Sequence, residues 1–271
     1  MAPIDHFAYG FLTPGLAYVV SSVGSMLGLT LTSRARLIGG REGLAWLAGA
    51  ALAIGGTGIW TMHFIAMMGF SVGGSPIRYD VPLTALSALI AVAVVGAGLF
   101  LVRQGGARPP YLLVGGTLTG MGVACMHYMG MAAMNMSGHV RYDPLIVAAS
   151  VLIAVVAATV ALWFTVRVRG ALMIGAAALV MGVAVSGMHY TGMFAMSVEP
   201  HAMTAPPPGS EAGDFLVPLL VGTSVITVGL LLVTLLSPSE REIREERELR
   251  DRLAARPGAS PEAGLFGAPR G

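Results

Sequence analysis

The stretch "TMHFIAMMGF" at residues 61–70 places a histidine inside an apolar segment, with one methionine directly before it and another four residues after it. The pattern returns as "CMHYMGMAAM" at 125–134 and as "GMHYTGMFAM" at 187–196. Ionisable side chains are costly inside membrane helices and usually mark functional positions. Three histidines in the same sequence frame therefore favour a shared site over three separate hydrogen-bonding roles.

Apolar runs long enough to cross a bilayer, roughly 20 residues each, recur along the whole chain. Only 11% of the 271 residues are charged and 55% are hydrophobic, whereas soluble domains carry about 25% charged residues. Backbone polar groups in lipid must be satisfied within their own segment, so each run is predicted to be a helix. The sequence thus predicts an all-α, polytopic membrane protein whose seven spans lie at about 11–31, 44–69, 82–102, 111–134, 145–166, 171–196 and 215–236.

The arginines predict the orientation of these spans, because basic residues mark cytoplasmic connections. Connections after the first, third and fifth spans and the tail after the seventh are rich in arginine, beginning with Arg34 and Arg36 after the first span. The opposite connections carry only Arg78 and Arg141. The N-terminus is therefore predicted to lie outside and the C-terminus inside. The opening "MAPIDHFAYG" has no basic residue, so no signal peptide is predicted.

The spans repeat as pairs. His63 and His127 are 64 residues apart, and His127 and His189 are 62 apart, a period that fits two spans with their connections. The second, fourth and sixth spans are therefore equivalent, and the tripeptide "RYD" recurs at 78–80 and 141–143. Prolines tolerated in a first helical turn predict outer-side starts for the odd spans, at Pro14, Pro82, Pro144 and Pro218.

A glycine stands seven residues before each motif histidine, at Gly56, Gly120 and Gly182. Small residues let helix backbones approach closely within a membrane. These three glycines are therefore predicted to form packing seams for the even spans.

The chain is predicted to divide into a membrane domain at 1–236 and a cytoplasmic tail at 237–271. The tail's sequence "SPSEREIREERELRDRLAAR" predicts a charged helix at about 239–255, supported by pairs of glutamate and arginine four residues apart. The remainder reads as a disordered end. No catalytic output domain is expected after it, and nothing in the sequence suggests nucleic-acid binding.

The three histidines are predicted to lie at one depth, on the order of 10 Å below the outer boundary at 1.5 Å per helical residue. A methionine four residues later shares the face of each histidine, and the methionine before it points toward a neighbouring helix. Imidazole suits several transition metals, and thioether sulfur selects soft Cu(I). The predicted copper ligands are His63, His127, His189, Met67, Met131, Met193, Met62, Met126 and Met188.

Other interpretations of the same residues stay open. Each methionine also fits ordinary packing beside an aromatic neighbour, and haem takes histidine and methionine ligands too. The remaining histidines, His6, His139 and His201, fall on the outer side, where solvation explains each of them. A weaker capture site formed by His139 and His201 is the alternative. Enzymatic activity is not predicted, because hydrolysis would need a positioned acid or base.

The motif copies at 62–65, 126–129 and 188–191 carry a resemblance to a known family. The last copy reads Met-His-Tyr-Thr, the second replaces threonine with methionine, and the first departs at its last two positions. Over about residues 8–236 the chain resembles the MHYT family of bacterial integral membrane sensor domains.

That resemblance implies a multi-pass protein of the bacterial inner membrane, with a periplasm-facing copper site that senses a diatomic gas such as oxygen, carbon monoxide or nitric oxide. It also implies frequent fusion to cytoplasmic diguanylate cyclase, phosphodiesterase or histidine kinase domains, from which this sequence departs. The first hypothesis is therefore a membrane sensor whose state is read by a separate cytoplasmic signalling partner. The second is a copper-handling protein that delivers the metal to a periplasmic or membrane oxidase.

Overall fold

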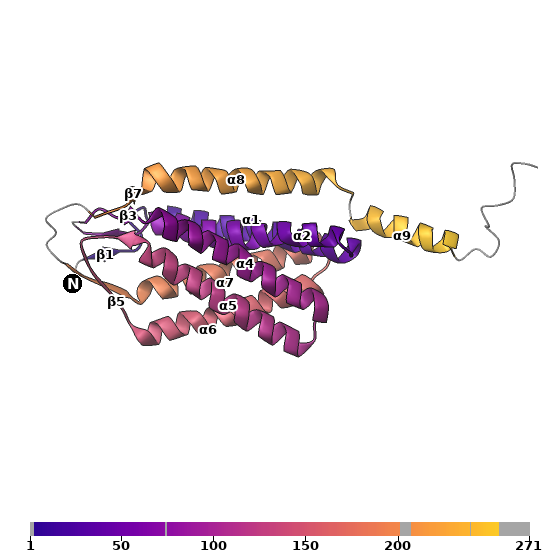
Figure 1. Cartoon of the computed structure of the whole chain (residues 1–271), viewed down its shortest axis with the longest axis horizontal. Coiled ribbons are helices and arrows are strands. Elements are labelled where there is room, and N and C mark those ends of the chain that lie inside the picture. The colour runs from indigo at the N-terminus through magenta and orange to yellow at the C-terminus, as the bar shows by residue number, and fades with distance from the viewer. Residues whose placement is uncertain (1–2, 74, 201–206, 239, 255–271) are drawn as a thin grey trace, which may run out of the picture. The chain divides into compact units, whose positions relative to one another are not determined.

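The computed structural model describes residues 3–73, 75–200, 207–238 and 240–254 (Figure 1). Seven helices in these ranges are long and apolar enough to cross a membrane, which confirms the predicted all-α, seven-span class. The second span, Glu42–Met68, consists of α2 (Glu42–Ala51), a π-helical segment η1 (Leu52–Thr61) and α3 (Met62–Met68). The other six are α1 (Leu12–Ile38), α4 (Val81–Gly105), α5 (Pro109–Ala132), α6 (Pro144–Arg167), α7 (Ala171–Phe194) and α8 (Ala212–Leu236).

Short antiparallel strands join the helices at one end (Figure 1). One pair is β1 (Ile4–Asp5) with β2 (Ser71–Val72), and another is β5 (Gly138–Tyr142) with β6 (Met196–Pro200). A third sheet has the order β4-β3-β7, formed by Met134–Asn135, Arg78–Tyr79 and Ser210–Glu211. These strands link connections that are far apart in the sequence.

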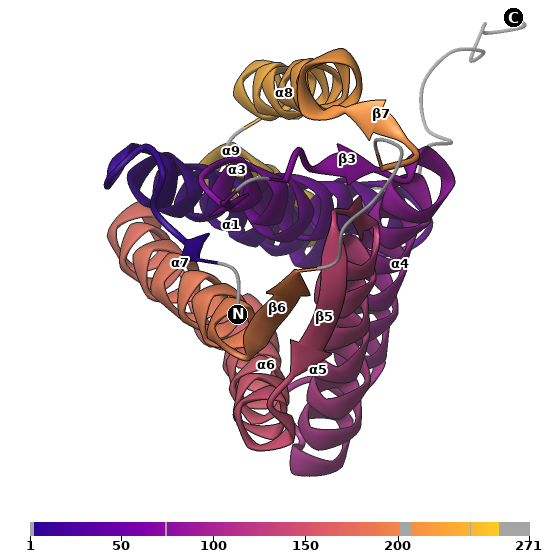
Figure 2. The ribbon, with the colours of Figure 1, turned by 90° about the vertical axis from the view of Figure 1, so that its left-hand side faces the viewer.

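Six spans form a closed ring. Following the chain, α4 packs on α5, α5 on α6 and α6 on α7. The ring closes because α7 packs on α1, α1 packs on the second span, and the second span packs on α4. The end-on view in Figure 2 shows this arrangement, with α8 on its outer side against η1 and α1. The chain divides into two compact units, Met1–Leu236 and Ser237–Gly271, and the second contains α9 (Glu240–Ala254).

One hydrogen bond recurs in all three repeats. The carbonyl of the residue six positions after each motif histidine accepts a bond from a backbone N–H of the connection that leads into an odd span. The three bonds are Ala8 N to Gly69 O at 2.9 Å, Asp80 N to Ala133 O at 2.8 Å and Asp143 N to Ala195 O at 2.9 Å. The repeats therefore share a local structure as well as a spacing.

The two "RYD" tripeptides start helices. Asp80 is the N-cap of α4 and Asp143 is the N-cap of α6, and each carboxylate accepts backbone N–H groups of its first turn. Such caps satisfy donors that the helix itself leaves open. The prolines that follow, Pro82 and Pro144, occupy the first turn as predicted.

Two predictions about helix ends are wrong. Pro218 lies inside α8, which begins earlier at Ala212, with Asp214 in a first turn that favours negative charge. Arg34 and Arg36 lie in the last turns of α1 rather than in a connection after it. Arg34 is buried there. Its guanidinium donates to the carbonyl of Thr234 at 2.7 Å and stacks on the ring of Trp46, and these contacts replace those that it would make with water.

The glycine seams are confirmed in two repeats and displaced in the third. A Cβ at Gly120 would collide with the backbone of Val155, and a Cβ at Gly182 would collide with Ser22. In the second span, however, Gly55 makes the close approach, because its Cβ would lie 2.7 Å from the Ala91 carbonyl, whereas Gly56 has room. The π-helical segment explains the shift, since its i→i+5 bonding fits an extra residue into a turn.

We predict that Gly120→Ala destabilises the bundle, because the new methyl group must push α5 away from α6. Overpacking of this kind costs about 1–3 kcal/mol of unfolding free energy. The matched control is Gly175→Ala in α7, where a Cβ meets nothing within 4 Å and alanine raises helix propensity. Thermal unfolding of the purified protein in detergent measures the difference, and equal stabilities for the two variants would contradict the seam.

Candidate metal centre

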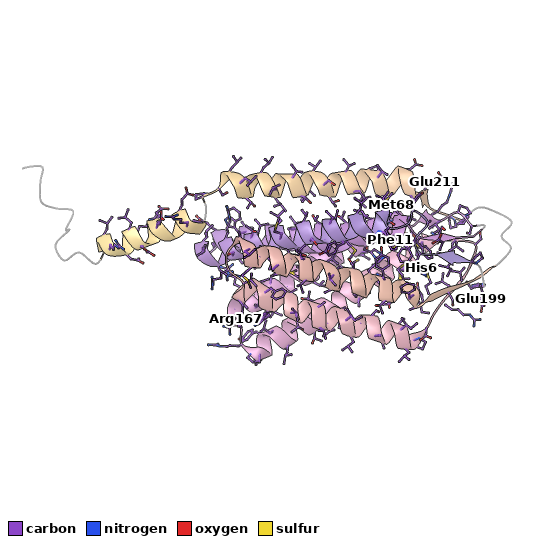
Figure 3. All side chains as sticks on the ribbon, turned by 180° about the vertical axis from the view of Figure 1, so that it is seen from behind. His6, Phe11, Met68, Arg167, Glu199 and Glu211 are labelled. Atoms are coloured by element: carbon purple, nitrogen blue, oxygen red, sulfur yellow. The ribbon has the colours of Figure 1, made fainter. Side chains whose placement is uncertain are left out.

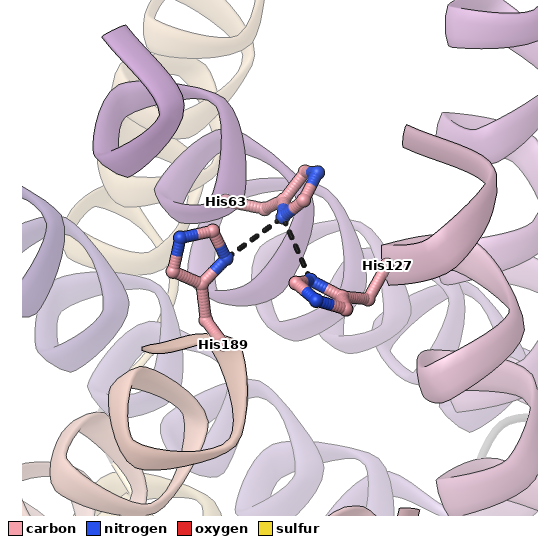
Figure 4. A group of neighbouring side chains, drawn as sticks. All are labelled: His63, His127 and His189. Atoms are coloured by element: carbon pink, nitrogen blue, oxygen red, sulfur yellow. Dashed lines mark hydrogen bonds between the residues drawn. The ribbon is translucent and has the colours of Figure 1, made fainter. Parts of the chain in front are cut away.

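The three motif histidines meet at the centre of the ring. His63 comes from α3, His127 from α5 and His189 from α7, and each is at most 2% exposed. Nδ1 of His63 lies 2.9 Å from Nδ1 of His189 and 3.1 Å from Nδ1 of His127 (Figure 4). The structure therefore brings together the side chains that the repeat pattern predicted to share a pocket. Metal binding by them stays a prediction.

The rings are arranged with near three-fold regularity. Their centroids are 4.9, 4.9 and 5.1 Å apart, and every pair is edge-to-face. The aromatic residue that follows each histidine also meets its ring edge-to-face, at centroid distances of 4.8, 5.0 and 4.9 Å for Phe64, Tyr128 and Tyr190. Edge-to-face packing is a favoured aromatic geometry, so these neighbours hold the imidazoles in their orientation.

Hydrogen bonding among the three Nδ1 atoms satisfies them poorly. A neutral imidazole nitrogen carries either a proton or an acceptor lone pair. Nδ1 of His63, which lies between the other two, can therefore form a full hydrogen bond with only one of them. A cation removes this conflict, because it accepts three lone pairs at once.

The distances also fit a cation. Imidazole nitrogen binds a transition ion such as zinc at about 2.0 Å, so three coplanar nitrogens on one ion would lie about 3.5 Å apart. The measured 2.9 and 3.1 Å are close to this separation. One nitrogen of each histidine lies within 4.8 Å of the others, and no carboxylate or thiolate belongs to the cluster found among the described residues.

The opposite nitrogens, Nε2, are buried and have no hydrogen-bond partner among the described atoms. A Cβ at Gly130 would collide with Nε2 of His63, and a Cβ at Gly192 would collide with Nε2 of His127. Each glycine stands three residues after the motif histidine of its own helix, where α3 has Ala66. Their lack of a side chain makes room for the rings, which the sequence interpretation missed although "MHYMG" and "MHYTG" display it.

All six predicted methionine ligands are buried, at 3% exposure or less. Met67, Met126, Met131, Met188 and Met193 belong to the main hydrophobic core. Met62 packs in a smaller cluster with Ala17 and Ala66. These are contacts with apolar neighbours, so ligation by thioether sulfur stays a prediction.

His6 packs near aromatic side chains, which its position in the sequence did not indicate. His6, labelled in Figure 3, follows β1, which pairs with the strand directly after α3. Its ring packs near Phe70 and Phe194 at centroid distances of 5.6 and 4.8 Å. This partial burial lowers its pKa, and the nearby Asp5 carboxylate partly opposes the shift. His6 is therefore partly buried rather than fully solvated.

His139 is an exposed residue of β5 opposite Glu199. His201 lies outside the described residues.

Comparison with known proteins agrees with the repeat. Three segments, 56–115, 120–178 and 182–244, match the family model MHYT, described as a bacterial signalling protein N-terminal repeat. Each segment contains one motif histidine and begins at one of the three predicted seam glycines. No solved structure matches the chain.

Curated relatives are signalling proteins. The chain is 44% identical over 193 residues to the bifunctional diguanylate cyclase/cyclic di-GMP phosphodiesterase MucR of Pseudomonas aeruginosa, a match covering 69% of this chain and 28% of that protein. It is 30% identical to the signaling protein YkoW of Bacillus subtilis, over 91% of this chain and 31% of that protein. The cyclic di-GMP phosphodiesterase NbdA of Pseudomonas aeruginosa is 34% identical to the chain, and the match covers 72% of this chain and 26% of that protein.

The chain thus spans less than a third of each of these relatives. Three matched repeats cover more than half of its residues. The chain belongs to the MHYT family of bacterial signalling proteins and is a multi-pass membrane protein.

Proposed function

We propose that this chain is a membrane sensor module that binds one copper ion through Nδ1 of His63, His127 and His189. The observation that carries the proposal is the meeting of three buried imidazole nitrogens at 2.9 and 3.1 Å. Neutral imidazole is a common metal ligand, and burial keeps competing water away. Bound copper would supply a centre that changes oxidation state or takes up a small ligand.

Copper is proposed over other metals because of the donor set. Three imidazoles alone also hold catalytic zinc, so the preference for copper rests on the methionine-rich core around this cluster. Soft sulfur neighbours favour Cu(I). Haem is disfavoured, because nitrogens only 2.9–3.1 Å apart leave no space for a macrocycle between them.

An apolar cavity supports sensing of a small gas such as oxygen, carbon monoxide or nitric oxide. The cavity has a volume of about 60 Å³ and is lined mainly by apolar side chains, including Met188 directly before His189. Apolar cavities of modest size stay dry and take up apolar guests. A dissolved diatomic gas would therefore find a holding place one residue from a proposed ligand.

The proposed output is a movement of helices. The three ligands come from three different spans, so any change in their separation moves α3, α5 and α7 against one another. Sensing requires such a coupling between two states. By the arginine distribution the site faces the periplasm, and a cytoplasmic signalling protein, of the kind that the relatives' names describe, would read the change. Copper delivery to an oxidase is the competing role, and it predicts copper transfer rather than a signal.

We predict about one copper per chain in membrane-purified protein and its loss in the triple variant His63→Gln, His127→Gln, His189→Gln, because all three nitrogens share the ion. Elemental analysis measures the metal. His139→Gln, an exposed histidine in β5, is the control and should keep the copper. An unchanged copper content in the triple variant would show that the ion binds elsewhere.

We further predict that Gly192→Ala weakens copper binding about 10–100-fold, the usual cost of disturbing groups that orient a metal ligand. Its methyl group must displace the ring of His127. Gly187→Ala in the same helix, where a Cβ meets nothing within 4 Å, should bind as the unmodified protein does. Titration against a Cu(I) chelator gives the affinities, and equal values for both variants would exclude ring positioning by Gly192.

A further inference from the structure

A second cavity, of about 290 Å³, lies at the opposite end of the bundle from the histidines' loops. The last turns of α1, α4 and α6 surround it, together with part of α2. Arg36 and Arg103 line it from two different helices, and the other described residues that line it are neutral. We propose that this cavity binds a phosphate group, either that of an anionic lipid or that of a soluble phosphate compound.

The charge of the cavity calls for an anion. Two guanidinium groups line the same cavity, Arg36 at the end of α1 and Arg103 at the end of α4. Glu42, the acidic residue at the start of α2, is exposed and does not line the cavity. Guanidinium forms strong, often bidentate, hydrogen bonds to phosphate.

The arginines are held in place by backbone carbonyls. Arg103 donates from Nη2 to the Gly40 carbonyl at 2.6 Å, and Arg36 donates from Nη2 to the Val168 carbonyl at 3.5 Å. The second terminal nitrogen of Arg103, Nη1, is buried and has no hydrogen-bond partner among the described atoms. Buried donors normally find a partner, and a phosphate oxygen in the cavity supplies one.

Ordinary roles do not account for this arrangement. Arginine in a last turn interacts favourably with the helix dipole, and Arg167 at the end of α6 does so while exposed and outside the cavity (Figure 3). Arg36 and Arg103 instead face a space many times larger than one water molecule needs. The cavity, rather than the arginines alone, distinguishes this end of the ring.

A lipid is the favoured source of the phosphate. The two arginines stand at the ends of membrane-crossing helices, where lipid headgroups lie. Basic pockets between such helices on the cytoplasmic side are known to take anionic headgroups. The ligand would bridge three spans at the ends away from the histidines, and its binding requires no metal.

The test uses the full chain in phosphatidylcholine nanodiscs, with and without phosphatidylglycerol, and counts retained lipid by native mass spectrometry. A second arm adds pyrophosphate to the phosphatidylcholine discs. We expect saturable binding of one phosphatidylglycerol per chain, weakened about tenfold or more by Arg36→Gln or Arg103→Gln, as loss of charged hydrogen bonds predicts. Arg167→Gln removes the same charge outside the cavity and should bind normally.

Val166→Phe fills the cavity without removing charge and should also prevent binding, which keeps the test valid if an arginine variant folds poorly. Pyrophosphate that binds in the second arm, and is lost in the same variants, would support the site with a soluble phosphate as its ligand. The proposal is overturned if the unmodified chain retains neither probe. It is equally overturned if Arg167→Gln weakens binding as much as the cavity variants do.

Discussion

Three imidazole nitrogens that face one another in an apolar bundle are the constraint on which the rest of this structure depends. Polar groups buried without satisfied partners are unfavourable. Nδ1 of His63 lies 2.9 and 3.1 Å from the other two Nδ1 atoms but can form a full hydrogen bond with only one of them. Such a cluster persists only if the surrounding helices hold it or a bound group completes it. The aromatic neighbours, the glycines beside Nε2 and the recurring loop hydrogen bonds all act on the position of these rings.

The ring of six spans follows from that requirement. A single pair of helices supplies one histidine and cannot enclose it, whereas three pairs close around a common axis and exclude water. Closure depends on the contact between α7 and α1, which joins the last repeat to the first. The seventh span, α8, lies outside the ring and adds no residue to the histidine cluster. The six spans of the ring therefore account for the geometry of the site.

Much of this arrangement could be predicted from the sequence, because its signals are periodic. The equal spacing of His63, His127 and His189 indicated equivalent helices, and the seven apolar runs indicated the spans. Local deviations could not be predicted. The π-helical turn that moves the seam from Gly56 to Gly55 has no marker in a hydropathy pattern. The burial of Arg34 depends on a carbonyl two hundred residues away, and the place of His6 depends on a two-residue strand pair.

The most direct test of the central claim is X-ray absorption spectroscopy of the copper-loaded protein in nanodiscs. The account predicts one copper per chain with three imidazole nitrogens at about 2 Å. Any additional sulfur scattering would identify thioether ligands from the surrounding methionines. Copper without imidazole neighbours, or a purified protein that retains no copper, would contradict the account.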